Sequence, residues 1–528
     1  GVLSIELHNG GRSDIEVDVI LECRWRRALL TVATTRPLAG PNRLVRGTIS
    51  NGVALEAGHG GHAPAIAVAG DQGASYRGGA GPDARATLDP GAELMAANGE
   101  LLRFDVSRTV RVRAGKHTTV SFFLAAAPER DGALATAEHL SRLGADELLR
   151  LARLDLARLT RKAADVATAG LLNRNLIYAY YAGVGRAVDD DRMYLLRSRS
   201  PQHGACAVFN EREALLWLLP TLTATDTFVA REALLRSFEQ YSHRPGERWR
   251  YLDGGVLAPG FCLDQACAYV VALDRHVTES RDATILDEPI VQDVLRELDE
   301  ILFGRLDPEY FLCATELLPS GERADYPFVA FDNALVWRFA DALPRLWRRR
   351  PGERPPRFEK SGEEIAAALW QRCTVEVDGM RVIGYASDLR GGIAIYDDPA
   401  GSLRLLPHYG FCEEDDPIWS NTMDLLHSSV YPLWHGKHPY PGFAVRSRPD
   451  RASFAAVCSD LLTPRRDAAI QLVRRLTLDA GIAGESYDPN TGRIAGGPYS
   501  AALAGFLAWA LLAEREAGAQ RTREAQTA

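Results

Sequence analysis

The sequence has few lysines, few cysteines and no long apolar run, and each deficit excludes a class of protein. Only 4 of its 61 basic residues are lysines, and 69 acidic residues outnumber the bases, which gives a net charge of −8. A nucleic-acid-binding protein needs a basic face, so this balance argues against a nucleic-acid partner. No stretch of about 18 apolar residues is present, so we expect no membrane-spanning helix and no membrane partner.

The 8 cysteines are scattered through the 528 residues without any CxxC pair. A zinc site needs thiolates or histidines at short spacing, and a disulfide scaffold needs a much higher cysteine density. We therefore expect buried free thiols. The first residues, Gly1 to Leu7, alternate like a strand and lack the basic flank and apolar core of a signal peptide. This predicts a cytoplasmic protein, while the strand-like start leaves open a truncated N-terminus.

Residues 1–130 are predicted to form an antiparallel β-sandwich. Polar and apolar residues alternate there, which is typical of strands that bury one face only. The segments with this pattern are 4–8, 15–20, 102–106, 109–113 and 119–124. Residues 114–117 favour a hairpin connection between the last two strands. The glycine-rich stretch from Gly58 to Gly81 is expected to be a long loop.

The rest of the chain is predicted to be helical, which makes the whole an α+β multidomain protein. Leucines at helical spacing in 131–168 indicate a linker helix. From 169 to 515 helices alternate with polar connections, roughly one helix per 30 residues, as in antiparallel helical hairpins. Because low-complexity linkers are missing, one barrel of paired helices is favoured over several bundles. The predicted helices are 171–188, 211–224, 227–242, 261–279, 289–303, 327–347, 361–374, 417–431, 450–462, 465–480 and 498–513. Residues 516–528 are expected to form a polar tail.

Carboxylates and aromatic side chains crowd into the connections of the helical half. The clusters are 209–213, 249–254, 397–399, 413–419, 431–437 and 484–488. The flat apolar faces of sugars stack on Trp and Tyr, and sugar hydroxyls need carboxylate, amide or guanidinium partners. Loops on one rim of a rigid scaffold are where binding sites concentrate. One charged loop is usually solvated surface, but six such loops together indicate a carbohydrate site.

Four stretches of this half resemble the (α/α)6-barrel glycoside hydrolases. That group includes glucoamylases, trehalases, the amylo-α-1,6-glucosidase part of glycogen debranching enzymes and exo-α-1,6-mannosidases. The stretches are 209–220, 313–316 followed by 327–337, 397–422, and 484–488 followed by 498–502. The resemblance covers about two thirds of the chain, and the N-terminal half resembles the sandwich of debranching-type proteins. It implies an N-terminal β-sandwich followed by an (α/α)6 barrel.

The resemblance also implies a mechanism. An inverting glycosidase needs one protonated carboxyl and one ionised carboxyl, about 6.5–9.5 Å apart so that a water fits between them. Glu485 matches the glutamate before the last helix that is the base in this group. Glu316 is the expected acid, because its apolar sequence neighbours favour a raised pKa. Asp325 and Glu322 are rival acids, because the mannosidases place theirs closer to the following helix.

A further set of residues is expected to line the sugar site. Arg212-Glu213 stands where the group usually has an Arg-Asp pair that grips the terminal sugar. For several members a structural role is the alternative: Asp398 could cap a helix, His408 could hydrogen-bond to backbone, and the tryptophans could be core. The expected set is Arg212, Glu213, Trp249, Asp253, Asp264, Asp398, His408, Tyr409, Trp419 and Trp434.

These features predict an exo-acting inverting glycoside hydrolase that cleaves α-linked glucosides in an oligosaccharide or polysaccharide. Two carboxylates suffice for hydrolysis, so we expect no metal and no organic cofactor. Three alternatives remain: an exo-α-mannosidase, favoured by 397–422; a non-catalytic carbohydrate-binding barrel; and a phosphorylase, against which a glutamate at position 485 argues. The sugar, the linkage and the oligomeric state are left open.

Overall fold

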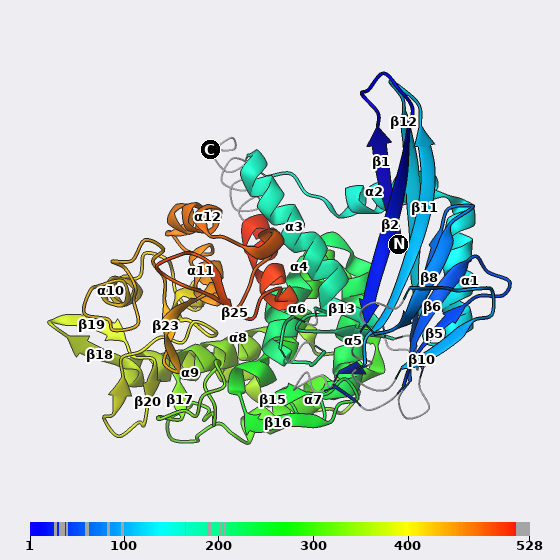
Figure 1. Cartoon of the computed structure of the whole chain (residues 1–528). Coiled ribbons are helices and arrows are strands. Elements are labelled where there is room, and N and C mark those ends of the chain that lie inside the picture. Colours follow the sequence, from blue (N-terminus) through cyan, green and yellow to red (C-terminus); the bar gives the residue numbers. More distant parts are fainter. Residues whose placement is uncertain are drawn as a thin grey trace, which may run out of the picture. The chain divides into compact units, whose positions relative to one another are not determined.

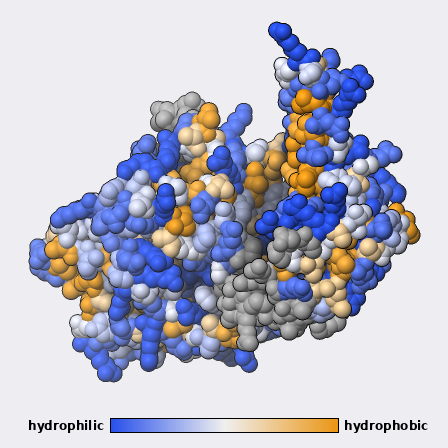
Figure 2. All heavy atoms as spheres, in the orientation of Figure 1, coloured by the Kyte–Doolittle hydropathy of each residue, from blue (hydrophilic) through white to orange (hydrophobic). Residues whose placement is uncertain are grey.

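A computed structural model describes residues 1–25, 29–30, 37–38, 41–58, 63–81, 85–96, 100–163, 165–186, 192–200, 202–204 and 207–513. The chain divides into two compact units, Gly1–Arg158 and Leu159–Ala528 (Figure 1). The expected tail 516–528 lies outside the described residues. Among the described residues, no helix combines the length and apolarity needed to cross a membrane. The visible surface is mostly hydrophilic, with apolar residues spread over it (Figure 2).

The first unit contains two antiparallel sheets whose apolar faces share one core. Val53, Leu55 and Phe122 of one sheet cluster with Phe104 and Val106 of the other, and all five are buried. The first sheet has the order β1 (Val2–His8), β12 (His117–Ala127), β7 (Ala65–Gly70), β6 (Gly52–Ala57), β5 (Asn42–Arg46), β10 (Glu93–Ala96). The second has the order β2 (Ile15–Trp25), β11 (Leu102–Val112), β8 (Ser75–Ala80), β9 (Ala86–Thr87), and β3 (Leu29–Leu30) pairs with β4 (Pro37–Leu38). The expected strands are present. The segments 102–106 and 109–113, expected to be two strands, form the single strand β11, which pairs with β2 along its whole length.

The glycine-rich stretch 58–81 is not the loop that its composition predicted, because β7 and β8 lie within it. Small residues serve close packing here. Ala67 of β7 and Ala133 of the helix α1 (Arg130–Leu143) are fully buried in one cluster. At Gly78 in β8, a Cβ would lie 2.7 Å from the Leu44 side chain and 2.9 Å from the Arg103 carbonyl oxygen. Residues 59–62 lie outside the described part of the chain.

Two helices occupy most of the segment expected to be a single linker helix. They are α1 (Arg130–Leu143) and α2 (Ala145–Leu159), separated by Gly144, whose φ of 81° is easily reached only by glycine. Helix α1 packs on β12, β7 and β6 and so is part of the first unit. The division between the units lies at Arg158, within the segment expected to be the linker.

Each of the eleven helical ranges predicted for the second unit contains a helix. In 450–462 the helix starts four residues late, because β23 (Arg448–Ser453) takes the place of the first turn. Helix α6 packs against both η1 and α8. The helices are α3 (Val166–Gly183), the π-helical η1 (Arg212–Leu218) continued by α4 (Leu219–Thr225), α5 (Thr227–Tyr241), α6 (Leu263–Ser280), α7 (Pro289–Phe303), α8 (Ala330–Leu346), α9 (Gly362–Arg372), α10 (Pro417–Leu426), α11 (Phe454–Asp460), α12 (Arg466–Arg475) and residues 501–513, with short 3-10 turns η2 (Ala283–Asp287), η3 (Arg357–Lys360), η4 (Leu403–Leu405) and η5 (Asp479–Gly481).

Short antiparallel strands connect these helices. They pair as β13 (Val184–Arg186) with β14 (Met193–Leu195), β15 (Glu247–Arg250) with β16 (Val256–Phe261), β18 (Thr374–Val377) with β19 (Met380–Ile383), β17 (Phe328–Val329) with β20 (Ala386–Ser387) and β21 (Ile393–Ala394), and β22 (Ala444–Val445) with β23, β24 (Ser486–Tyr487) and β25 (Ile494–Gly496). Several of these strands directly precede the first turn of a helix, so the side chains there stand at helix N-terminal ends.

Candidate active site

Arg197, just after β14, joins two glutamates that are far apart in sequence. Its Nε donates to Oε2 of Glu213 at 2.6 Å, and its Nη2 donates to Oε1 of Glu485 at 2.7 Å. The guanidinium also lies 5.1 Å from the centroid of the Trp249 ring. Arg197 and Glu213 are buried, whereas 31% of the Glu485 side chain is exposed. Glu485 is thus a carboxylate that is held in place and still open to solvent.

The electrostatics of this first cluster favour the charged form of Glu213 and the neutral form of His203. Burial opposes the charge on Glu213, but the Arg197 guanidinium outweighs it and lowers the pKa of Glu213. Burial and then the charge of Arg197 lower the pKa of His203. Its Nδ1 lies 3.2 Å from the carbonyl oxygen of Pro498, and its Nε2 lies 3.6 Å from Oε1 of Glu485. A neutral His203 that donates from Nδ1 can therefore accept a hydrogen bond at Nε2, beside Glu485.

A second cluster surrounds Arg212, the first residue of η1. Its Nη1 donates to Oδ2 of Asp264, in the first turn of α6, at 2.9 Å. Asp332 lies in the first turn of α8, and Asp398 lies in the loop after β21. All three aspartates are fully buried. Asp398 accepts the backbone N–H of Ser320 at 2.8 Å, while both oxygens of Asp332 lack a hydrogen-bond partner among the described residues.

These buried carboxyls share one guanidinium, so they cannot all be ionised. Burial, followed by the nearby charges of Asp264 and Asp398, raises the pKa of Asp332 well above its usual range. Burial also raises the pKa of Asp398 to about 6, although hydrogen bonds from Ser320 oppose the shift. The cluster therefore places a protonated carboxyl, that of Asp332, which can donate, beside the Asp398 carboxylate, which accepts hydrogen bonds. Such a mixture suits the hydroxyl groups of a sugar.

The two clusters form one polar region, because Arg212 and Glu213 are consecutive in η1. Arg212 serves the aspartate cluster, and Glu213 serves the cluster of Arg197 and Glu485. The π-helical turn that carries both residues is a rare geometry that proteins often use at functional sites.

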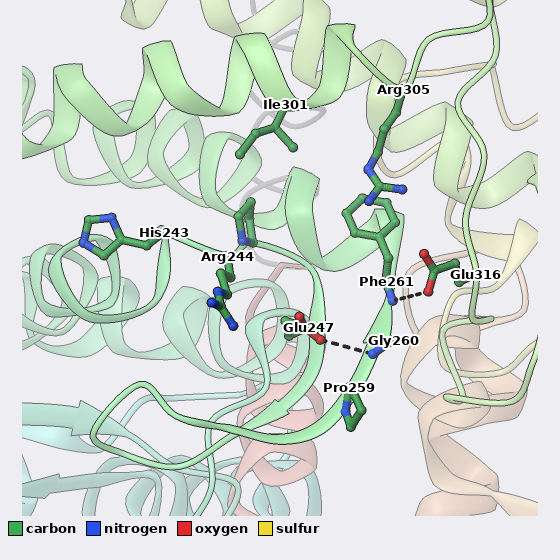
Figure 3. A pocket seen from close by; sticks show the side chains of 10 residues that line it. His243, Arg244, Glu247, Pro259, Gly260, Phe261, Ile301, Arg305 and Glu316 are labelled. Carbon is green, nitrogen blue, oxygen red and sulfur yellow. Dashed lines mark hydrogen bonds between the residues drawn. The ribbon is translucent and has the colours of Figure 1, made fainter.

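Glu316, the expected acid, lines a separate pocket of about 440 Å³ (Figure 3). Its Oε2 accepts the backbone N–H of Phe261 at 3.2 Å, and Arg305 covers the Phe261 ring at 3.4 Å from its centroid. The pocket is completed by residues of 243–247, 259–260 and α7. The Glu316 side chain is exposed, so the apolar setting expected for it is wrong: its apolar neighbours in sequence point elsewhere.

The rival acids, Glu322 and Asp325, lie on the loop after Glu316, and this loop contacts Asp398 of the aspartate cluster. In this loop Leu318 donates its N–H to the carbonyl of Glu322 at 2.7 Å, and the N–H of Ser320 is bound to Asp398. Oε1 of Glu322 accepts the N–H of Ser447 at 3.0 Å, and the carboxylate is only partly exposed. Asp325 is exposed and pairs with Arg446 at 2.6 Å. Glu322 thus stands two residues from the contact with Asp398.

Tyr409 and His408 have different surroundings although they are adjacent. Tyr409 is buried, and burial raises its pKa. The charges of Arg275, Asp264 and Arg212 have smaller effects on this pKa. Because Asp264 and Arg212 belong to the second cluster, Tyr409 lies beside that cluster. Nε2 of His408 lies 2.9 Å from Nη2 of Arg275, and burial followed by the Arg275 charge lowers its pKa to about 3. Arg275 is about three turns along α6 from Asp264, so His408 is paired away from the cluster.

Three further residues of the expected sugar site have structural contacts. Asp253 is exposed and accepts the N–H of Gly255 at 2.8 Å within a turn. Trp419 is buried, and its Nε1 donates to the Leu403 carbonyl at 3.0 Å. Trp434 packs on Phe443, with ring centroids 4.4 Å apart. The two tryptophans have the contacts of core residues, and the sugar-binding roles expected for all three residues stay predictions. Trp249, by contrast, lies against Arg197 in the first cluster.

Sequence reasoning missed Arg197, His203 and Asp332. Asp332 carried a signal, because it is a charged residue within an apolar helix start in 327–337. Arg197 and His203 carried none, because each is one of many polar residues in a loop before η1.

Comparison with solved structures finds similar folds among glycosidases. A metal-independent α-mannosidase of Streptococcus pneumoniae, in a non-productive complex with α-1,6-mannobiose, matches with a TM-score of 0.60 and 13% identity over 70% of this chain and 98% of that one. A bacterial glucoamylase complexed with acarbose matches with a TM-score of 0.60 and 12% identity over 97% of this chain and 80% of that one. The chain shares the fold of these glycosidases. The resemblance to this group is thereby confirmed at the level of fold. No protein-family model and no curated protein matches the sequence.

Proposed function

We propose that the protein is an exo-acting glycoside hydrolase that cleaves α-linked glucosides with inversion at the anomeric carbon. In this proposal the second unit is an (α/α)6 barrel that follows an N-terminal β-sandwich. The observation that carries the proposal is the hydrogen bond between Arg197 and Glu485, which holds a partly exposed carboxylate beside a buried cluster of hydroxyl-binding groups. The shared fold with a glucoamylase and an α-mannosidase supports it.

Glu485 is the proposed general base. A base must be ionised and must reach water, and Glu485 has a guanidinium at 2.7 Å and keeps about a third of its side chain exposed. The buried His203, with its Nε2 at 3.6 Å from Oε1 of Glu485, packs behind the proposed base. Arg197 is the proposed positioning residue, because it donates a hydrogen bond to Glu485 and is itself held by the buried Glu213.

Glu322 is the proposed general acid, in preference to Glu316 and Asp325. The acid must stay protonated, so a cation beside it is unfavourable and a neighbouring carboxyl is favourable. Asp325 is ion-paired with Arg446, and Glu316 faces the separate pocket. Glu322 lies on the loop whose Ser320 N–H binds Asp398, and the Arg446 side chain is engaged by the hydrogen bond and ion pair with Asp325 rather than with Glu322.

The cluster of Arg212, Asp264, Asp332 and Asp398 is the proposed binding site for the terminal sugar. The protonated Asp332 would donate to one hydroxyl of the sugar, and Arg212 and the neighbouring carboxylates would fix adjacent hydroxyls. Because these groups are buried, they suit the end of a chain rather than its middle, which supports exo action.

An exo-α-mannosidase is the second candidate function. The segment 397–422 resembles the exo-mannosidases, and it brings Asp398 into the aspartate cluster. The fold shared with the Streptococcus pneumoniae α-mannosidase supports this candidate equally. The two sugars differ in the orientation of the C2 hydroxyl, so the substrate must decide between them.

Monosaccharide release from α-1,4- and α-1,6-glucosides and from α-1,6-mannosides, followed by proton NMR, tests the proposal. We expect release from the non-reducing end, with the β-anomer appearing first. Release of mannose alone would select the second candidate. A protein inert on every substrate would instead be a non-catalytic binder, and turnover that requires phosphate would make it a phosphorylase.

A further inference from the structure

Three metal-ligand side chains meet on the first sheet, outside the candidate active site. Strand β1 pairs antiparallel with β12 in a register that sets His8 opposite His117 and Glu6 opposite Thr119. Residues two apart on a strand share a face, and directly opposed residues on paired strands share it too. Glu6, His8 and His117 therefore project from one face, and all three are exposed.

The distances between the ligand atoms match those around a small divalent ion. Nε2 of His8 lies 3.3 Å from Oε1 of Glu6, and Nε2 of His117 lies 3.8 Å from the same oxygen. Nitrogen and oxygen ligands at about 2.0–2.1 Å from a tetrahedral ion lie about 3.3 Å apart. The His8 and Glu6 ligand atoms already have this separation. A small rotation of the exposed His117 ring brings its Nε2 to the same separation from Glu6.

We propose that Glu6, His8 and His117 form a binding site for a divalent transition metal ion of the zinc type. Two imidazoles and one carboxylate suit Zn²⁺, Cu²⁺ or Ni²⁺, whereas Mg²⁺ and Ca²⁺ prefer all-oxygen sites. Three protein ligands leave one position of a tetrahedral ion for water or for another ligand. This site is independent of the proposed hydrolysis.

The position of the site gives the ion a structural role. Strand β1 is an edge strand of its sheet, and among the described strands it pairs with β12 alone, so contacts along that pair hold it in place. At one end of the β1–β12 pair, Val2 and Phe123 pack in the cluster that contains Leu134 of α1. Glu6, His8 and His117 lie at the opposite end, whose tip is hydrophilic in Figure 2. An ion bound there would hold β1 to β12 at the end of the strand pair that is opposite to the packing of α1.

Calorimetric titration of the whole chain with Zn²⁺, after removal of metal with EDTA, tests the site. We expect one tight site per chain, and His8→Ala, His117→Ala and Glu6→Gln should each weaken it by about tenfold or more. His438→Ala is the matched control, because His438 belongs to another close histidine pair, with ring centroids 5.1 Å apart. Binding that survives in all three variants, or that is lost in the control, would overturn the proposal, as would a wild type that binds no Zn²⁺.

Thermal unfolding supplies a second readout that does not depend on the calorimetric signal. Zn²⁺ should raise the Tm of the wild type and of His438→Ala but not that of His8→Ala, because an ion bound only to the folded state stabilises it. In EDTA the variants should unfold at the wild-type temperature, which establishes that they fold. An equal Zn²⁺-induced shift in His8→Ala and wild type would contradict the proposed ligands.

Discussion

Arg197 donates a 2.7 Å hydrogen bond to Glu485, a residue 288 positions further along the chain. The same guanidinium binds Glu213 at 2.6 Å, so one cation faces two carboxylates. Of the two, only Glu485 keeps substantial exposure. This arrangement holds the proposed base in place and leaves it open to solvent, and it makes the role of each member testable.

Replacing Arg197 should lower the rate of catalysis more than it weakens substrate binding. In Arg197→Gln the Glu485 carboxylate loses the guanidinium that holds it at 2.7 Å. We expect kcat to fall by about tenfold or more while KM changes little, because the base is no longer held where it can activate water. Arg199→Gln is the control, since Arg199 is exposed. An unchanged kcat in Arg197→Gln would show that Arg197 does not position the base.

The acid can be identified with three matched substitutions. Glu322→Gln should lower kcat by about 10²–10⁴-fold on natural glycosides, because the leaving oxygen loses its proton donor. The loss should be much smaller on an aryl glycoside with an acidic leaving group, which needs little protonation. Glu316→Gln and Asp325→Asn should keep most of the activity. A larger loss in either of these than in Glu322→Gln would reassign the acid.

In the aspartate cluster, replacing the cation should lower the stability of the protein much more than replacing the protonated aspartate. Arg212→Gln leaves three buried carboxyls without a counter-ion and should lower the free energy of unfolding by about 3–5 kcal/mol. Asp332→Asn preserves the shape of a protonated carboxyl and should change it by less than about 1 kcal/mol at neutral pH. Denaturant unfolding measures both. Equal destabilisation would mean that Asp332 is ionised.

Glu211 should make stability depend on pH. It is buried, it accepts a hydrogen bond from Tyr269 at 3.1 Å, and burial, opposed by Arg250, raises its pKa to about 7. Because the folded state then holds the proton more tightly than the unfolded state, the free energy of unfolding falls as pH rises from about 4.5 to about 7. Glu211→Gln cannot lose a proton, so wild type should lose about 3 kcal/mol relative to this variant over that range. Parallel stability curves would contradict this.

The sequence predicted the elements of both units far better than the partners within the site. Strands such as β1 and the eleven helical ranges follow from local periodicity, which needs no knowledge of distant residues. The stretch 58–81 was misread because glycine and alanine were interpreted as flexibility, whereas their small size permits close packing at Gly78.

The site residues were harder to predict because their roles depend on contacts between distant segments. Glu485 could be chosen from a motif, but its partner Arg197 is set by packing across 288 residues. Glu316 looked shielded because its sequence neighbours are apolar, yet its own side chain turns outward. The neighbours in space, not those in sequence, decide whether a carboxyl stays protonated.

The rate of monosaccharide release by Glu485→Gln tests the central claim most directly. The exposed Glu414→Gln serves as control. On whichever α-glycoside the wild type hydrolyses, we predict that Glu485→Gln lowers kcat by about 10²–10⁴-fold and still binds the substrate. The control should turn over like the wild type. Wild-type turnover by Glu485→Gln would contradict the account.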